Sequence, residues 1–381
     1  MRLKKALLVF GTRPEAIKMA PLVLELKKYS TIIESKVCVT AQHRGMLDQV
    51  LDIFDIKPDF DLDIMNPNQD LYDITEKILK GMKEVLSEYK PDVVFVHGDT
   101  TTAFVSALSA FYRKIPIAHV EAGLRSHDLC SPWPEEGNRK LISQLSTYNF
   151  APTFRCKQNL INENSNVDSI TITGNTVIDA LFFVLKKIKS DEEYRKRLEE
   201  VIIEVYKNFL SSNKYILITG HRRENFGKGF VNICHSIRNL AYRYPNIDFV
   251  YPVHLNPNVQ EPVFELLNEI ENIYLIQPME YEAFVYLMSK SHIILTDSGG
   301  IQEEAPSLGK PVIVMRENTE RTETLELGIV KLVGTDTEKI MKEVSDLCDN
   351  RVYYDEMSRY FSPYGDGTAA EKIIKVILNT L

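Results

Sequence analysis

Short apolar runs alternate with helical patterns along nearly the whole chain, and this alternation restricts the fold more than any other feature. In the first half the runs are Ala6–Phe10, Lys36–Thr40, Val93–His97 and Ile117–Glu121. In the second half they are Tyr215–Thr219, Asp248–Pro252, Ile273–Ile276, His292–Thr296 and Pro311–Met315. Strands that alternate with helices form βαβ units, and the strands of such units are parallel. We therefore predict an α/β protein with two doubly wound, Rossmann-like domains and a central cleft.

The boundary between the two domains is expected at about residue 175, within the sequence TITGNTVIDA. Gly174 and Asn175 interrupt a strand-like run there, and a helical pattern begins at Thr176. A chain of 381 residues also suits two domains better than one. The prediction is an N-terminal domain at 1–175 and a C-terminal domain at 176–367.

Capping signals predict helices in the middle and at the end of the chain. Thr100–Thr102 can cap a helix through Ala103–Tyr112. Thr368 and Glu371 have the spacing of a capping box, and an apolar stripe follows them. Because an apolar stripe needs a covering surface, we expect the helix at 368–381 to pack back on the N-terminal domain.

The composition excludes several classes of function. Lys and Arg number 45 against 53 Asp and Glu, and this charge of −8 does not suit a surface that binds nucleic acid. No apolar run approaches the roughly 18 residues of a membrane span. The five cysteines lack CxxC spacing, suit a reducing compartment, and are interpreted as buried small hydrophobic residues. We expect a cytoplasmic protein that does not bind membranes.

Polar clusters follow the predicted strands. They are Gly11–Arg13, Gln42–Arg44, Gly98–Thr100 and Glu121–Gly123 in the first half, and Gly220–Arg223, His254–Asn256 and Asp297–Gly300 in the second. Open α/β sheets bind ligands outside the carboxyl ends of their strands. One such edge from each domain predicts a site in the cleft.

The cluster Asp297–Gly300 ends a strand and opens a helical run, so its N–H groups and the helix dipole could hold a diphosphate. On its own this pattern is more often a plain turn. Glu303 and Glu304 lie one turn further on, where a carboxylate could accept both hydroxyls of a ribose. A nucleoside diphosphate is therefore the predicted ligand.

Four basic side chains are candidate partners for the phosphates. Arg13 and Lys18 lie at the start of the first helix and one turn into it, and Arg321 is a third cation. Each of these alone is more often a solvated surface charge. His221 follows a predicted strand beside two arginines and could also contact a phosphate, although a lone histidine there is more often structural.

Three carboxylates are candidates for acid–base chemistry. Asp99 and Glu121 end apolar strands, where an unpaired carboxylate is costly and burial would raise its pKa. Glu135 lies at a helix start in SPWPEEGNR, a position that also favours a carboxylate for stability alone.

Nine motifs together resemble those of the non-hydrolysing UDP-N-acetylglucosamine 2-epimerases. In chain order they are GTRPEAIK, TAQHRGMLDQVLDIF, HGDTTT, HVEAGLRS, PWPEEGNR, TGNTVIDAL, TGHRRENFG, YPVHLNPNV and DSGGIQEEAPSLGKPV. The resemblance covers nearly the whole chain. It implies a glycosyltransferase-B-like fold and interconversion of UDP-N-acetylglucosamine and UDP-N-acetylmannosamine, a step of polysaccharide biosynthesis. We also expect a homodimer.

The resemblance also implies roles for individual residues. The expected UDP contacts are Arg13, Lys18, His221, Ser298, Gly299, Gly300, Glu304 and Arg321, with the uridine near Met279 and Phe284. Met279 departs from the glutamine of some relatives. The expected catalytic residues are Asp99, Glu121, Glu135 and His221. An activating site for UDP-N-acetylglucosamine would lie near Gln42, His43, Gln49 and His254.

The family reaction eliminates UDP to give 2-acetamidoglucal and then adds UDP back. Which carboxylate removes the C2 proton and which delivers the new one stays open. We expect no metal, because cations and backbone amides can hold the diphosphate, and no nicotinamide cofactor, because GTRPE lacks the GxGxxG loop.

Three alternatives to the epimerase remain open at this point. They are a retaining glycosyltransferase of the same architecture, a hydrolysing epimerase that releases N-acetylmannosamine and UDP, and a non-catalytic sensor of nucleotide sugars. The three carboxylates favour the epimerase.

Overall fold

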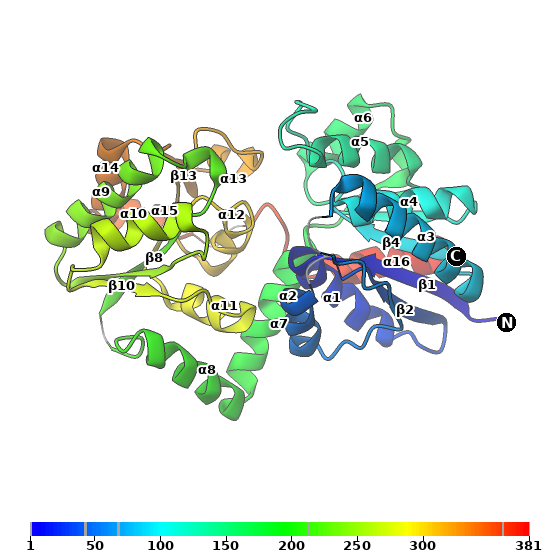
Figure 1. Ribbon diagram of the computed structural model, residues 1–381, viewed down its shortest axis with the longest axis horizontal. Helices are drawn as coiled ribbons and strands as arrows, with labels where there is room; N and C mark the ends of the chain where they lie inside the picture. Colours follow the sequence, from blue (N-terminus) through cyan, green and yellow to red (C-terminus); the bar gives the residue numbers. More distant parts are fainter. Residues whose placement is uncertain (1, 42–43, 67–68, 212, 360–361, 381) are drawn as a thin grey trace. The chain divides into compact units, whose positions relative to one another are not determined.

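The computed structural model of the protein describes residues 2–41, 44–66, 69–211, 213–359 and 362–380 (Figure 1). Contacts within the chain define two compact units. Unit 1 comprises Met1–Ala180 and Tyr364–Leu381, and unit 2 comprises Leu181–Pro363. The division falls inside helix α7 (Thr176–Ser190), a few residues after the boundary expected from the sequence, and α7 begins at the expected residue.

Unit 1 contains a seven-stranded parallel sheet with the order β3-β2-β1-β4-β5-β6-β7. The strands are β1 (Lys4–Phe10), β2 (Ile33–Val39), β3 (Phe60–Asp61), β4 (Val93–His97), β5 (Ile117–Val120), β6 (Tyr148–Ala151) and β7 (Ile170–Ile172). All residues of β4 are buried, as expected for a parallel strand that helices cover on both faces. The strand order reverses between β1 and β4, which is the switch point of a doubly wound sheet.

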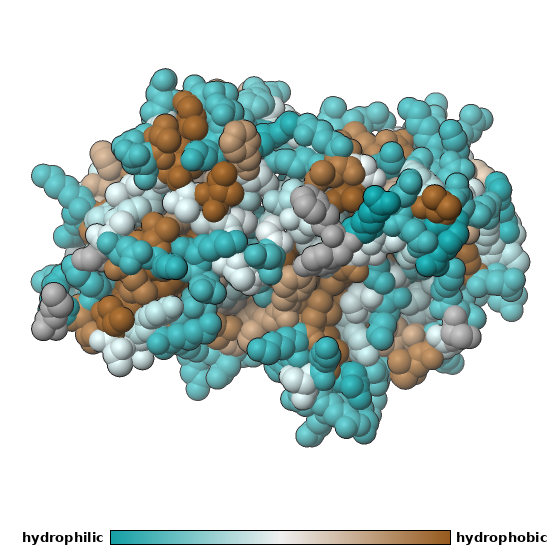
Figure 2. Space-filling view, turned by 180° about the vertical axis from the view of Figure 1, so that it is seen from behind, coloured by the Kyte–Doolittle hydropathy of each residue, from teal (hydrophilic) through white to brown (hydrophobic). Residues whose placement is uncertain are grey.

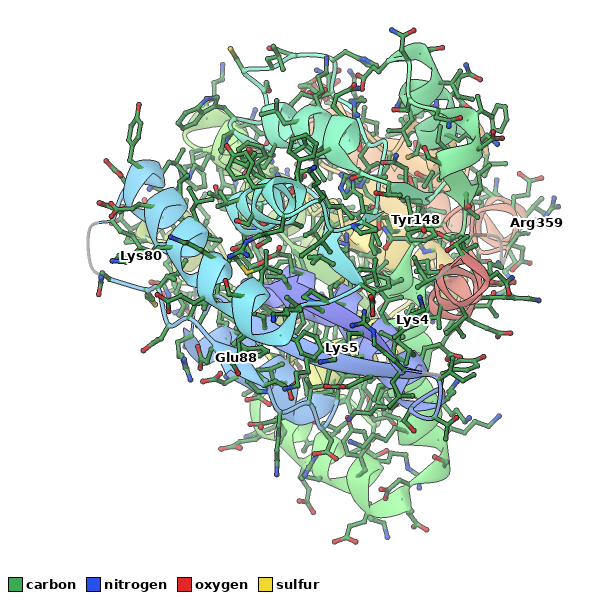
Figure 3. All side chains as sticks on the ribbon, turned by 90° about the vertical axis from the view of Figure 1, so that its right-hand side faces the viewer. Lys4, Lys5, Lys80, Glu88, Tyr148 and Arg359 are labelled. Atoms are coloured by element: carbon green, nitrogen blue, oxygen red, sulfur yellow. The ribbon has the colours of Figure 1, made fainter. Side chains whose placement is uncertain are left out.

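Helices alternate with the strands of unit 1 and cover its sheet. They are α1 (Arg13–Lys27), α2 (Arg44–Ile53), α3 (Leu71–Tyr89), α4 (Thr101–Tyr112), α5 (Glu135–Leu145), α6 (Phe154–Asn162), η1 (Val167–Ser169), the start of α7, and α16 (Ala369–Thr380). In α3, Ile78 and Met82 are fully buried, whereas Lys80 and Glu88 point away from the sheet (Figure 3). This separation is the amphipathic pattern of a surface helix.

The last helix, α16, packs against α1 within unit 1. Its first N–H groups, those of Ala369 and Ala370, donate to the carboxylate of Asp179 in α7 at 3.2 and 2.9 Å. Burial raises the pKa of Asp179 to about 6, although these N–H groups lower it. A carboxylate from another helix therefore holds the start of α16, which the local capping-box pattern does not indicate.

Unit 2 contains a six-stranded parallel sheet with the order β10-β9-β8-β11-β12-β13. The strands are β8 (Lys214–Thr219), β9 (Ile247–Pro252), β10 (Ile273–Ile276), β11 (Ile293–Thr296), β12 (Val312–Val314) and β13 (Val330–Leu332). The order reverses between β8 and β11. Each unit is therefore a doubly wound α/β unit of the Rossmann type, as predicted.

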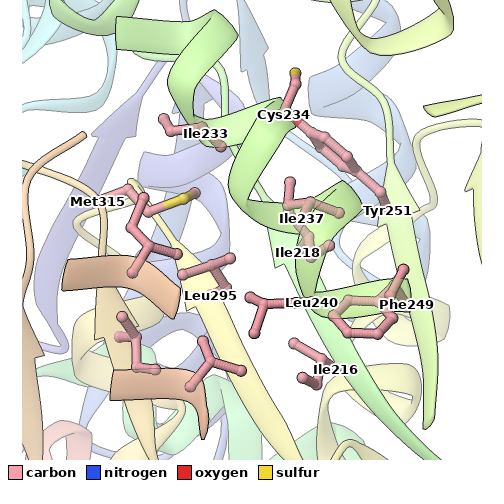
Figure 4. Packing of buried hydrophobic residues seen from close by; sticks show 14 of the residues in the cluster. Ile216, Ile218, Ile233, Cys234, Ile237, Leu240, Phe249, Tyr251, Leu295 and Met315 are labelled. Carbon is pink, nitrogen blue, oxygen red and sulfur yellow. The ribbon is translucent and has the colours of Figure 1, made fainter. Parts of the chain in front are cut away.

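The core of unit 2 forms between its sheet and the helices that connect the strands. These helices are α8 (Glu192–Val205), η2 (Arg223–Asn225), α9 (Lys228–Arg243), α10 (Pro257–Leu267), α11 (Tyr281–Lys290), α12 (Ile301–Glu304), η3 (Pro306–Leu308), α13 (Thr322–Glu326), α14 (Thr337–Asp349) and α15 (Arg351–Met357). Ile233, Ile237 and Leu240 on one face of α9 pack in a fully buried cluster with Ile216 of β8 and Phe249 of β9 (Figure 4).

Each strand expected from the sequence is present, and β7 matches the strand-like run before Gly174, but three further strands are not expected. These are β3, β6 and β13. β6 reads Tyr-Asn-Phe-Ala and β3 has only two residues, so neither contains a run of branched apolar side chains. The interpretation of the cysteines is wrong for Cys130, which is exposed because it lies in a surface loop before α5.

The visible surface in Figure 2 is mainly hydrophilic, with apolar residues in scattered groups. Among the described residues, no helix combines the length and the apolar character needed to cross a membrane.

Candidate functional site

Polar turns at the carboxyl ends of the strands meet at the switch point of each sheet. In unit 1 the turn after β1 leads into α1 at Arg13, and the turn after β4 contains Gly98–Thr100. In unit 2 the turn after β8 contains His221, and the turn after β11 contains Asp297–Gly300. Switch points are where open α/β sheets bind ligands. The expected polar clusters thus follow strands within each unit, apart from Gln42–Arg44, of which Gln42 and His43 lie outside the described residues.

Glu15 joins the two turns at the switch point of unit 1. Its Oε2 accepts from the N–H groups of Gly11 and Thr12 at 3.1 and 2.9 Å and from the Thr12 hydroxyl at 2.8 Å. Its Oε1 accepts from the Thr100 hydroxyl at 2.7 Å. Thr12 and Thr100 are the N-caps of α1 and α4, so this buried carboxylate fixes the two helix starts relative to each other. Burial raises the pKa of Glu15, and its hydrogen bonds lower it.

Glu121 lies directly after β5 in the left-handed backbone region, at φ +64°. Its Oε2 accepts a hydrogen bond from Nζ of Lys18 and another from Nδ2 of Asn175 at 2.6 Å. The same oxygen lies 3.8 Å from Nε2 of His97. Lys18 therefore supports the negative charge of Glu121, a contact that the sequence does not indicate.

Asp99 is held by Arg139 of α5. Nε of the guanidinium donates to Oδ2 of Asp99 at 2.8 Å, and Nη2 forms an ion pair with the same oxygen at 2.7 Å. Its Nη1 donates at 3.1 Å to Glu136, which is fully buried and also accepts from the N–H groups of Ser126 and His127. Burial raises the pKa of Asp99, while Arg139 lowers it. Asp99 thus combines a raised pKa with a fixed orientation, and both suit acid–base chemistry.

The three candidate carboxylates lie together in unit 1. After burial itself, the nearby charges of Glu121 and Glu135 also raise the pKa of Asp99. Glu135 is the first residue of α5, and its Oε2 is buried without a hydrogen-bond partner in the described part of the chain. Asp99 is therefore close enough to Glu121 and Glu135 to be influenced by their charges.

Two buried histidines surround this cluster without adding charge. Burial lowers the pKa of His97 to about 3 and that of His119 to about 4. Nε2–H of His119 donates to the carbonyl of Gly98 at 2.8 Å. Both rings are neutral near pH 7, whereas Lys18 pairs with Glu121 and Arg139 pairs with Asp99 as cations.

In unit 2, Arg321 packs against the turn after β11. A Cβ on Gly299 would lie 3.0 Å from Cζ of Arg321, so only glycine allows this approach without displacement. Arg321 donates to fully buried Glu303 at 2.9 Å and pairs with Glu320 at 2.5 Å. Burial raises the pKa of Glu320, but Arg321 and Arg316 bring it down to about 2. Glu303 is thus paired with Arg321, and the contact of Glu303 or Glu304 with a ribose stays a prediction.

The helix after this turn is shorter than the sequence suggests. α12 has only the four residues Ile301–Glu304 and is followed by the 3-10 helix η3. The dipole of a single turn is small, so the N–H groups of Ser298–Gly300 are the better candidates for contact with an anion.

His221 lies in the turn after β8, beside Asp297. The N–H groups of His221 and Arg222 donate to Oδ2 of Asp297 at 2.9 and 2.8 Å. The imidazole of His221 stacks on that of His254 with ring centroids 5.0 Å apart. Burial lowers the pKa of His221, while the charge of Asp297 raises it.

The other expected site residues lie in both units. Met279 and Phe284 lie just before and within α11, and Glu304 ends α12. Gln49 is exposed on α2 in unit 1, His254 is in unit 2, and Gln42 and His43 fall outside the described residues. The regulatory site and the homodimer stay predictions. Within the described ranges, no group of three or more His, Cys, Asp or Glu side chains is arranged to hold a metal ion.

Several residues of these networks are not indicated by the sequence-based analysis of the site. They are Glu15, His97, Arg139, Asn175 and, as the acceptor for the N–H groups of His221 and Arg222, Asp297. Glu15 has a local signal, because Thr12 and Glu15 have capping-box spacing. The contacts of Arg139 with Asp99 and of Asn175 with Glu121 join distant parts of the chain, so no local spacing could reveal them.

Comparisons with known proteins identify the family to which this chain belongs. Residues 25–378 match the family model of UDP-N-acetylglucosamine 2-epimerase. The UDP-N-acetylglucosamine 2-epimerase of Campylobacter jejuni is 59% identical over 375 residues, which cover 98% of this chain and 97% of the relative. The crystal structure of the Neisseria meningitidis UDP-GlcNAc 2-epimerase bound to UDP-GlcNAc has a TM-score of 0.91 and 55% identity, and the match covers 98% of this chain and 100% of that one.

A more distant structure shows the same fold. The Methanocaldococcus jannaschii UDP-GlcNAc 2-epimerase, in complex with UDP-GlcNAc and UDP, has a TM-score of 0.82 and 34% identity, with 98% of this chain and 99% of that one covered. Two doubly wound units with polar turns at their switch points are typical of enzymes that bind nucleotides. The chain belongs to the UDP-N-acetylglucosamine 2-epimerase family.

We predict that Glu15→Ala lowers the free energy of unfolding by about 2–4 kcal/mol, because it leaves buried donors at two turns without an acceptor. Chemical denaturation followed by circular dichroism measures this loss. Glu76→Ala, which removes an exposed carboxylate from α3, should change stability by no more than about 0.5 kcal/mol. Equal midpoints for the two variants would show that Glu15 does not hold the turns.

Proposed function

We propose that the protein interconverts UDP-N-acetylglucosamine and UDP-N-acetylmannosamine by eliminating UDP and adding it back. Family membership supports this activity, as do the relatives whose structures contain UDP-GlcNAc or UDP. The observation that carries the mechanism is the group of three carboxylates in unit 1, with Asp99 and Glu121 each held by a cation.

The chemistry of the substrate explains why UDP has to leave. The C2 proton lies beside an acetamido nitrogen and not beside a carbonyl, so it is not acidic enough for simple removal and return. Departure of UDP with the C1–O electron pair leaves oxocarbenium character on C1 and the ring oxygen, so the C2 proton can be removed as its bonding electrons form the C1–C2 double bond. The product is 2-acetamidoglucal, and addition of UDP with protonation from the other face gives the epimer.

Unit 2 supplies the groups suited to the departing UDP. The N–H groups of Ser298–Gly300 would contact the diphosphate, beside the guanidinium of Arg321 that packs on this turn. His221 would contact the phosphates, Glu304 the ribose, and Met279 and Phe284 would lie near the uridine. Arg13 would contribute a further cation from unit 1.

Unit 1 supplies the groups suited to proton transfer. Asp99 has a raised pKa and a side chain oriented by Arg139, so it can hold or release a proton at a defined position. Glu121 is oriented by Lys18 and Asn175. The buried, unpartnered oxygen of Glu135 would assist near the sugar ring. We assign Asp99 and Glu121 as the acid–base pair without fixing their order.

Proton NMR of the purified protein with UDP-N-acetylglucosamine alone in D2O tests the proposed function. We expect UDP-N-acetylmannosamine to form and C2 of the sugar to gain deuterium, because the carboxyl group that returns the proton exchanges with solvent. Release of N-acetylmannosamine and UDP would instead show a hydrolysing enzyme. If UDP-N-acetylglucosamine stayed unchanged, the result would contradict epimerisation, and a glycosyltransferase or a non-catalytic sensor would be the remaining alternatives.

Asp99→Asn and Glu121→Gln keep the shapes of the side chains but remove their titrating charge. We expect turnover to fall by about 100-fold or more in each variant. UDP affinity, measured by calorimetry, should change little because the proposed UDP contacts lie mainly in unit 2. The matched control Glu76→Gln on the exposed face of α3 should retain full turnover. Near-normal turnover of either site variant would remove that residue from the acid–base pair.

A further inference from the structure

The two carboxylate oxygens of Asp297 have different surroundings. Oδ2 accepts from the N–H groups of His221 and Arg222 at 2.9 and 2.8 Å and from Nδ2 of Asn225 at 3.3 Å. Oδ1 is buried but has no hydrogen-bond partner among the described residues. The whole residue is fully buried. A buried, charged oxygen without a donor is costly, so its position calls for an explanation.

The imidazole of His221 is the group best placed to satisfy this oxygen. Nδ1 of His221 lies 3.9 Å from Oδ1 of Asp297, about 1 Å beyond a charge-assisted hydrogen bond. A small ring movement would close this gap. The His221 side chain is 44% exposed, so the ring faces buried Asp297 and also reaches solvent.

The charges around His221 oppose one another. Burial, His254 and Arg222 lower its pKa, and the charge of Asp297 raises it. Tyr251 also faces Asp297, and its pKa lies well above the usual value, so it is neutral. A diphosphate beside the ring would add a second negative charge and favour the imidazolium form.

We propose that Asp297 is a positioning residue for His221, accepting Nδ1–H through Oδ1 and so directing a positively charged ring with Nε2–H toward the departing diphosphate. The inference rests on the proposed function. As the C1–O bond breaks, its electron pair stays on the β-phosphate oxygen, and Nε2–H of His221 donates a hydrogen bond to the phosphate. No proton is transferred between His221 and the phosphate in this step. On re-addition the oxygen returns its electron pair to C1, and the hydrogen bond weakens.

A purely structural role for Asp297 would rest on Oδ2 alone. In Asp297→Asn the amide oxygen can still accept from the turn, but the amide nitrogen would replace Oδ1. It would donate to Nδ1 of His221 and disfavour the charged ring. Asn225→Ala is the matched control, because it removes a partner of Oδ2 and leaves Oδ1 and His221 in place.

The test is a double-mutant cycle with pH profiles of kcat, using Asp297→Asn, His221→Gln and the double variant. Activity of the wild type should fall as pH rises through the pKa of His221 in the complex, since the charged ring is lost. In Asp297→Asn this decline should move to lower pH, kcat at neutral pH should fall by about 10- to 100-fold, and KM should change by less than about 3-fold. Adding Asp297→Asn to His221→Gln should have little further effect.

The proposal would be overturned if Asp297→Asn lowered kcat equally in the wild type and in His221→Gln. It would also be overturned if the pH profile of kcat did not shift in Asp297→Asn. Asn225→Ala should leave the pH profile of kcat unchanged. If the profile of Asn225→Ala shifted as much as that of Asp297→Asn, the cause would be a loosened turn after β8 and not the loss of the Oδ1 contact. Circular dichroism melting identifies any variant that fails to fold. If Asp297→Asn does not fold, NMR titration of the His221 ring in the UDP complex of Asp297→Glu tests the proposal instead. Because this variant retains a carboxylate, its His221 ring should stay charged. A wild-type protein that forms no UDP-N-acetylmannosamine would refute the proposed function itself.

Discussion

A buried carboxylate ties together the two turns at the switch point of each sheet. In unit 1, Glu15 follows β1 and accepts from Thr100 after β4. In unit 2, Asp297 follows β11 and accepts from the N–H groups of His221 and Arg222 after β8. Adjacent parallel strands bring these turns together, and several backbone N–H groups of the turns point to the buried carboxylate and not to a strand. An acceptor with two oxygens satisfies several of them at once.

These ties let each unit hold reactive groups at fixed positions. Glu15 fixes the start of α1, from which Lys18 reaches Glu121, and the start of α4, which follows Asp99. Asp297 fixes the turn that carries His221. Rigid placement matters because acid–base groups act only within hydrogen-bonding distance of the proton that they move. The proposed chemistry is correspondingly divided, with proton transfer in unit 1 and stabilisation of UDP in unit 2.

The sequence predicts the parts of this arrangement that depend on local patterns. Strand periodicity locates the polar turns, because the carboxyl ends of buried strands are visible as apolar runs followed by Gly, Asp or His. It does not locate β6, whose Tyr-Asn-Phe-Ala sequence lacks that pattern. Pairing between distant residues is also hidden. Lys18 matches a phosphate ligand by position, yet its ammonium group contacts Glu121, which is far away in the sequence.

The central claim is that the C1–O bond to UDP breaks and forms again in every productive turnover. UDP-N-acetylglucosamine with a heavy-oxygen label in the bridge between C1 and the β-phosphorus tests it most directly. During elimination the β-phosphate can rotate, so phosphorus NMR should show the label spreading to the non-bridging oxygens at a rate comparable with epimerisation. Complete epimerisation with the label still confined to the bridge would contradict the elimination and re-addition of UDP.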